Sequence, residues 1–456
     1  MTAPLSCATF GTNELHRKIS AAVFALSAIL TVVSEVSGLD ILARVAGICL
    51  VVFIVLEFSK IGWPQKIAAL VLLGVAMVVA LRAGRLPEAL GEGVLRTLPF
   101  MLIFTSVGWL RAAAMQSTSV QRLGSVLPTL GAGRRFAALA LASHLIGAGF
   151  NLAGIGLLAP MLDTARVGEW DRRRLRCAIL WGFAAAPCWS PFIVGTVAIL
   201  SVFEGLRWIQ VLPYGVALAC GFLIWAVIWN RVFRAGRRTG PTPVLAPEIA
   251  APAGQLLGVI LMLFVVVFAV MAAAALPLTV AIALVAPIFA LAWGRGAGKA
   301  AQGDLIRRVL AGYPGMRSET TVFAAANIFG AAVSSALADE GIALSPGELT
   351  GWLYLDALLL LWGFLGVSAI GIHPVVSLVV FAALVDPSAL GMPLPVLAAV
   401  MMACWGMGTS VSPLSGTTLL MAQLTGVSSF TIAWRWSGAF YAAACLWLAL
   451  LITLAV

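Results

Sequence analysis

Charged residues are scarce in this chain of 456 residues. Asp, Glu, Lys and Arg together make up 10% of it, whereas hydrophobic residues make up 62%. A water-soluble surface needs far more charge, so this composition excludes a soluble globular protein. Apolar runs long enough to cross about 30 Å of hydrocarbon recur from one end to the other. The sequence therefore predicts an all-α polytopic membrane protein.

Residues that ligate metals or perform acid–base chemistry are also few. The chain has three His and seven Cys, and none of the Cys pair at metal-ligand spacing. We therefore expect no enzyme activity, no catalytic residues, and no cofactor or metal beyond sodium ions. The net charge of +10 is explained by basic cytoplasmic loops, so we expect the lipid bilayer, and no nucleic acid, as a partner.

Eleven apolar runs read as spanning helices, and two further segments do not. The runs lie near residues 19–37, 41–59, 64–82, 97–116, 177–203, 208–233, 255–275, 277–294, 319–337, 394–424 and 430–455. The two other segments, 136–162 and 351–385, carry Gly or Pro near their middle. This pattern favours re-entrant hairpins, with two kinked spans as the alternative. The charged run 169–176 reads as a solvated helix on the membrane surface.

The loop charges indicate an orientation. With a cytoplasmic N-terminus and two re-entrant hairpins, 22 of the 28 Lys and Arg lie in cytoplasmic loops. Five lie outside, and Arg111 lies within a span. This bias predicts a multi-pass protein of the bacterial inner membrane with a periplasmic C-terminus.

A shift of 222 residues aligns the two halves of the chain. Gly149 falls on Gly371, Ser190-Pro191 on Ser412-Pro413, and Thr196 on Thr418. An odd number of crossings per half makes the repeats inverted, which is typical of secondary transporters. The predicted divisions are a tail and extra helix at 1–40, a first repeat at 41–234 with hairpin 136–162 and broken helix 177–203, a cytoplasmic linker at 235–254, and a second repeat at 255–456 with hairpin 351–385 and broken helix 394–424.

Four elements place polar residues within apolar surroundings: the two hairpin turns and the breaks in two long helices. Proline removes a backbone donor, so each break should leave carbonyl oxygens for a cation and helix N-termini for an anion. Helix packing is the alternative role for any single Ser or Thr there. The predicted substrate-binding residues are Asn151, Thr196, His373, Ser412, Thr417 and Thr418, and the predicted cation-binding residues are Gly149, Asn151, Ser190, Gly371, Thr409 and Ser412.

Neither hairpin turn and neither helix break contains Asp, Glu, Lys or Arg. Proton-coupled carriers usually hold a carboxylate or histidine in the membrane, so this absence favours sodium. His373 keeps a proton in consideration, because it could bind substrate, carry a proton or cap the turn.

The layout resembles the ion transporter superfamily, in particular the divalent anion/sodium symporters. That family carries Ser-Asn-Thr at each hairpin turn, of which Phe150-Asn151-Leu152 keeps the Asn and Ile372-His373-Pro374 keeps none. The Ser-Pro and Gly-Thr or Thr-Thr pairs of the breaks are similar to the family's. The resemblance implies eleven spans, two hairpins, a dimeric scaffold and elevator-type motion.

These observations predict a secondary active transporter of a small organic or inorganic anion, coupled to sodium. A sodium/proton antiporter on the same scaffold is the alternative, with His373 as its titrating group. A channel is less consistent with paired inverted breaks, which favour alternating access.

Overall fold

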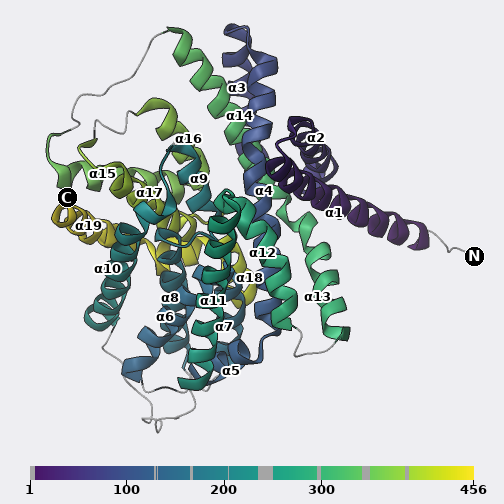
Figure 1. The fold of residues 1–456 in the computed structure, drawn as a ribbon. Coiled ribbons are helices and arrows are strands. Elements are labelled where there is room, and N and C mark those ends of the chain that lie inside the picture. The colour runs from purple at the N-terminus through teal and green to yellow at the C-terminus, as the bar shows by residue number, and fades with distance from the viewer. Residues whose placement is uncertain are drawn as a thin grey trace, which may run out of the picture. The chain divides into compact units, whose positions relative to one another are not determined.

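The computed structural model of the chain describes residues 6–127, 130, 132–164, 168–203, 205–234, 250–294, 299–340, 350–385 and 390–456. These residues form helices joined by short connections, and no strand occurs among them (Figure 1). Within this part of the chain, eight helices are long and apolar enough to cross a membrane. The protein is therefore an all-helical, multi-pass membrane protein, as its composition predicts.

Eight of the eleven predicted spans coincide with these eight helices. The other three are divided, short or polar. Predicted span 177–203 is divided between two helices, and span 277–294 is a helix of 16 residues. Span 319–337 lies in a helix of 24 residues that is rich in Ser, Thr and Ala. Residues 235–249 of the predicted linker lie outside the described part.

Packing divides the chain into two compact units, each made of two separate stretches. Unit 1 comprises Met1–Ala113 and Val265–Ile342, and unit 2 comprises Ala114–Phe264 and Ala343–Val456. The sequence pattern divides the chain into consecutive halves. Packing divides it differently, because each unit draws one stretch from each half.

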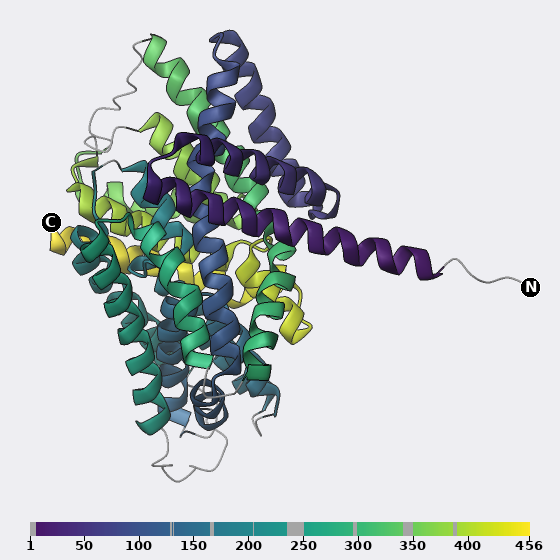
Figure 2. The same cartoon turned by 45° about the vertical axis from the view of Figure 1, so that its right-hand side comes forward.

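Unit 1 holds the first helices of each half. These are α1 (Ser6–Ser37), α2 (Asp40–Glu57), η1 (Phe58–Lys60), α3 (Trp63–Arg82), most of α4 (Leu86–Gln116), the end of α11 (Ala250–Ala274), α12 (Leu278–Trp293), α13 (Lys299–Gly312), η6 (Tyr313–Met316) and α14 (Arg317–Glu340). α1 runs alongside α2 (Figure 2), where Ser27 Oγ donates to the Ala46 carbonyl at 2.9 Å. α3 lies beside α14 (Figure 1), and the alanines Ala76, Ala80 and Ala332 let the two helices approach closely.

Unit 2 holds the predicted hairpins and broken helices. Its elements are α5 (Thr118–Val126), α6 (Ala132–Phe150), α7 (Ala153–Thr164), α8 (Glu169–Ala184), η3 (Ala186–Cys188), α9 (Val194–Val202), α10 (Trp208–Arg234), the start of α11, α15 (Leu353–Ala369), α16 (Pro374–Leu384), α17 (Leu394–Val411), α18 (Gly416–Thr425), η8 (Thr431–Trp436) and α19 (Gly438–Ala455). A buried stack of Trp181 on Phe440, with ring centroids 3.8 Å apart, joins α8 to α19. Trp181 Nε1 also donates to Ser437 Oγ at 3.2 Å. The two halves therefore share one core in this unit.

The run 169–176 differs from its prediction. It is not a separate surface helix, because α8 continues through it to Ala184. Arg174 and Arg176 are buried, which the surface assignment did not anticipate. Each forms an ion pair with a carboxylate: Arg174 Nε lies 3.2 Å from Asp171, and Arg176 Nη2 lies 2.7 Å from Asp163. A paired guanidinium can be buried where an unpaired one could not.

Candidate functional site

The first hairpin turns at Asn151, between α6 and α7. Asn151 has a φ of 55°, a left-handed conformation that Asn tolerates better than most residues. Its backbone N–H donates to the Gly147 carbonyl at 2.8 Å. Gly149, just before the turn, lies against Ile260, since a Cβ there would approach the Ile260 side chain to 3.2 Å. Asn151 itself is half-buried, which leaves its amide available at the turn.

The first helix break lies between α8 and α9, where Pro187 and Pro191 remove backbone donors. Ser190 Oγ donates to the Ala148 carbonyl at 2.5 Å, and so fastens the break to the end of α6. Thr196 Oγ1 donates to the Ser190 carbonyl at 2.7 Å. Both side chains are fully buried. The Thr196 hydroxyl therefore satisfies a carbonyl of the break itself, whereas the Ser190 hydroxyl satisfies a carbonyl of α6.

Aromatic rings surround the first break. Trp208 Nε1 donates to the Trp189 carbonyl at 2.8 Å, and Trp189 Nε1 lies 3.1 Å from His144 Nε2. The Trp189 ring also stacks on Phe264, with centroids 5.6 Å apart. These contacts hold the first break rigidly and occupy a carbonyl that a cation could otherwise use.

The second hairpin turns at Gly371, between α15 and α16. Gly371 has a φ of 101°, and a Cβ there would lie 2.7 Å from Leu414 in the second break. The backbone conformation favours glycine here, and a Cβ would in addition push the end of the Leu414 side chain aside. His373 is the N-cap of α16, and its Nδ1 accepts the N–H of Val375 at 3.2 Å. Of the three roles considered for His373, capping is the one that this contact displays.

The second break lies between α17 and α18, around Pro413. Thr418 Oγ1 donates to the Ser412 carbonyl at 2.5 Å. Ser415 is the N-cap of α18, where its Oγ accepts the N–H of Thr418 at 3.3 Å and also donates to the Thr409 carbonyl. Ser412 and Thr417 are buried beside these bonds. The break is thus a hydrogen-bonded turn between two helices.

The two breaks share one local structure under the 222-residue shift. α9 begins at Val194 and α18 at Gly416, which are equivalent positions. Each break carries the same hydrogen bond from a Thr to the Ser six residues earlier. The broken helices also meet at equivalent positions, because a Cβ on Gly406 would overlap the carbonyl oxygen of Ala184. The repeat that the sequence predicts is therefore matched by repeated geometry.

Each hairpin contacts the broken helix of the other half. α7 packs against α18, and α16 packs against α9. Trp405 of α17 packs against the first half, because a Cβ on Gly195 would approach its ring to 2.5 Å. The Trp405 and His373 rings also make a T-shaped contact, with ring centroids 5.5 Å apart. No spacing pattern in the sequence marks this contact of Trp405.

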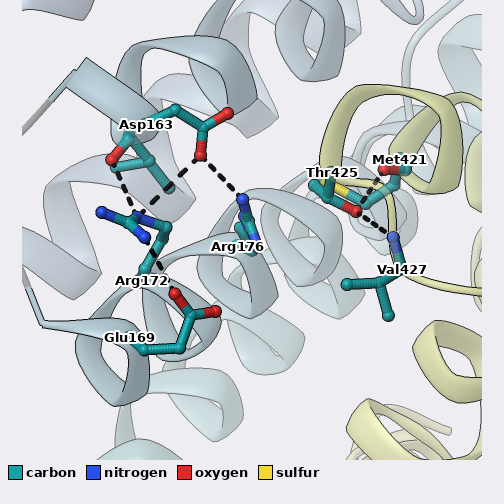
Figure 3. Close-up of polar contacts among 8 residues, drawn as sticks. Asp163, Glu169, Arg172, Arg176, Met421, Thr425 and Val427 are labelled. Atoms are coloured by element: carbon teal, nitrogen blue, oxygen red, sulfur yellow. Dashed lines mark hydrogen bonds and ion pairs between the residues drawn. The ribbon is translucent and has the colours of Figure 1, made fainter.

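The base of the first hairpin is fixed by ion pairs (Figure 3). Asp163, at the end of α7, lies 2.7 Å from Arg176 Nη2 and 3.9 Å from Arg172 Nε. Arg172 also pairs with Glu169 at 2.8 Å. These pairs join the base of the first hairpin to α8. The bond from Ser190 to Ala148 joins the hairpin to the first break near its turn.

The structure brings some predicted site residues together and leaves others apart. Ser190 with Thr196, and Ser412 with Thr418, are in direct contact. Thr409 joins the second pair through Ser415. In the described part of the chain, no side-chain hydrogen bond joins Asn151 or Thr417 to another predicted site residue. The N-termini of α7, α9, α16 and α18 adjoin the two turns and two breaks, and their dipoles favour negative charge there.

Comparison with known proteins identifies the fold. No protein-family model matches the chain, and no curated protein matches it in sequence. The solved structure of the YdaH transporter of Alcanivorax borkumensis is similar, with a TM-score of 0.57 at 16% identity. The similarity covers 86% of this chain and 98% of YdaH. At this identity the likeness shows a shared fold, which is that of a membrane transporter.

Proposed function

We propose that this protein is a secondary active transporter that moves a small organic or inorganic anion across the bacterial inner membrane, coupled to sodium. The observation that carries the proposal is the repeated break, closed in each half by the same Thr-to-Ser hydrogen bond. Paired discontinuous helices in inverted repeats are how secondary transporters build their sites. The fold shared with the YdaH transporter agrees with this assignment.

An anion is the solute that the local electrostatics favour. Four helix N-termini adjoin the turns and breaks, and no acidic side chain lies in the turns or breaks themselves to oppose a negative solute. Each N-terminus presents backbone N–H groups and a partial positive charge. We assign substrate contacts to Asn151, Thr417 and the His373 turn, with Thr196 and Thr418 holding the breaks in shape.

Sodium is the coupling ion that the available oxygens favour. Sodium takes hydroxyl and carbonyl oxygens, and the second break is rich in both. Both breaks use a Thr hydroxyl on the preceding Ser carbonyl. In the first break, Ser190 is also bonded to the Ala148 carbonyl of α6, and the Trp189 carbonyl accepts from Trp208. We therefore place the cation at the second break, with Ser412 as its principal side chain.

An elevator motion is the mechanism we propose, and the attachment of the first hairpin supports it. Bonds at both ends tie it to α8 and the first break, so it moves with them as one body. In this proposal unit 2 carries the solute and unit 1 is the scaffold, in a homodimer. A sodium/proton antiporter is the second candidate, favoured only by the position of His373 at the second turn.

The test is a matrix of melting temperatures for the purified protein. Carboxylates and oxyanions are each added in sodium or in choline at matched ionic strength. A ligand at 100 times its Kd stabilises the folded state by about 2.7 kcal/mol. We expect one class of anion to raise the melting temperature only with sodium, and uptake into proteoliposomes to follow the same pattern.

Variants separate the site from general stability. Ser412→Ala and Thr417→Val should abolish the sodium-dependent shift. Thr425→Val, at the far end of the same helix, removes a bond to the Met421 carbonyl and one from the Val427 N–H (Figure 3), both away from the break, and should leave the shift unchanged. A shift with pH or sodium alone, and with no anion, would replace this proposal with the antiporter.

A further inference from the structure

An apolar cavity of about 420 Å³ lies within unit 1. Its walls come from α1, α4, α12 and the junction of α13 with η6. Small side chains, Ala25, Ala28 and Ala283, leave the space, and Tyr313 borders it. Ile29 also lines the cavity and is 59% exposed, so the cavity opens at the surface of the unit.

The lining is mostly hydrocarbon, and only Thr105, Trp109 and Tyr313 among the lining side chains carry a polar group. The one hydroxyl from α4, Thr105 Oγ1, points back to its own helix and donates to the carbonyls of Met101 and Leu102 at 3.0 and 2.9 Å. An unsatisfied polar group placed among such residues would lose free energy. The cavity therefore suits a hydrocarbon chain.

A cluster of basic side chains lies near one end of α1. The Glu57 carboxylate, whose side chain is fully buried, is 3.1 Å from His16 Nε2, 3.4 Å from Lys60 Nζ and 3.4 Å from Arg317 Nη1. The three basic side chains are 31%, 41% and 33% exposed. Three basic side chains, two of them permanent cations, face two carboxyls here, because Glu319 also lies within electrostatic reach of Arg317. The cluster therefore keeps an excess of basic groups at this surface.

The cavity and the cluster share two elements of unit 1. α1 carries His16 in the cluster and, nine positions later, Ala25 in the cavity, a separation of about 14 Å along a helix. Tyr313 borders the cavity, and Arg317 follows it by four residues. A cationic patch and an apolar cavity at this spacing match the head and tail of one lipid molecule.

We infer that unit 1 binds an anionic phospholipid, with an acyl chain in the cavity and the phosphate at Lys60 and Arg317. Basic clusters beside spanning helices attract anionic head groups, and each cation near the surface contributes to that attraction. Charge complementarity distinguishes this ligand from a neutral lipid or an apolar solute. The inference does not depend on which solute the protein transports.

Native mass spectrometry of the detergent-purified protein tests the head group. Phosphatidylglycerol and phosphatidylcholine with the same acyl chains are titrated separately. We expect phosphatidylglycerol to bind about tenfold more tightly, and Lys60→Gln to remove most of that preference while Lys60→Arg retains it. Arg96→Gln is the matched control, because Arg96 pairs with Glu92 at an exposed position of the same unit. Equal affinity for both lipids would overturn the inference.

A photoreactive phosphatidylglycerol, with a diazirine in its chain, tests the cavity. Adducts are expected on peptides of α1 and α12, and Ile29→Trp should suppress them by filling the cavity from its exposed edge. Adducts spread over other helices, or unchanged by Ile29→Trp, would overturn the placement of the chain. Competition by an alkane-like solute as strong as that of the lipid would reassign the cavity to an apolar ligand.

Discussion

Thr418 donates its hydroxyl to the carbonyl oxygen of Ser412 at 2.5 Å, across the gap between α17 and α18. Thr196 makes the same bond to Ser190 at 2.7 Å, between η3 and α9. A break in a helix exposes carbonyls that would be costly to leave unpaired away from water. Each Thr hydrogen-bonds one such carbonyl in its own half. The breaks are therefore stable structures on which a binding site can be built.

Removal of that hydroxyl should destabilise the fold. Thr418→Val keeps the shape of the side chain and leaves the Ser412 carbonyl without this partner, which costs about 1–3 kcal/mol. Thr418→Ser should recover most of the loss. The measurement is the melting temperature in detergent, with Thr425→Val as the control on the same helix. Equal loss in Thr418→Val and Thr425→Val would contradict the role given to Thr418.

The crossing of the broken helices should not accept a side chain at Gly406. A Cβ there would overlap the Ala184 carbonyl, and a backbone atom cannot move aside cheaply. We expect Gly406→Ala to lower the melting temperature or the yield of folded protein. Gly363→Ala is the control, because a Cβ on Gly363 of α15 meets nothing within 4 Å. Helix propensity alone would make both changes favourable by about 1 kcal/mol, so a stable Gly406→Ala would show that the helices are farther apart.

Loss of Asp163 should loosen the first hairpin. Asp163→Asn leaves Arg176, whose side chain is only 7% exposed, without its carboxylate. Because the Asp163 side chain is 44% exposed, the cost is about 1–2 kcal/mol, below that of a fully buried pair. Faster hydrogen exchange in α7 is the expected result. The Arg307–Asp304 pair, which is exposed on both sides, supplies the control, since Arg307→Gln should change little.

Substitutions of His373, the N-cap at the second turn, distinguish a structural role from a role in ion coupling. His373→Asn keeps a side chain that can accept the Val375 N–H, whereas His373→Ala does not and should cost about 1 kcal/mol. We expect Asn to retain both stability and sodium-dependent anion uptake. Loss of transport in His373→Asn at full stability would instead give the imidazole a role in transport, and loss of the pH dependence of uptake in the same variant would make that role proton coupling.

The helices and the position of each break could be predicted from local patterns. Apolar runs mark the spans, and Ser190-Pro191 and Ser412-Pro413 mark the breaks, because proline acts on its own neighbourhood. Contacts between distant segments left no such mark. Trp405 against Gly195, and the packing of α7 on α18, depend on how the helices assemble. The buried arginines of α8 were assigned to the surface because two of their partners, Asp163 and Asn230, are not near them in sequence, although Asp171 lies three residues before Arg174.

The meeting of Ala184 with Gly406 has a consequence for how such a chain can change over time. The two residues are the same position in two copies of one repeat, so this position touches its own counterpart. Where a residue contacts non-equivalent positions, a substitution in one half does not act on its own counterpart, and the sequences of the two halves can diverge. At the crossing, a larger residue in place of Gly406 is opposed directly by the backbone of Ala184 in the other half. Divergence of the halves is therefore least free where their helices cross.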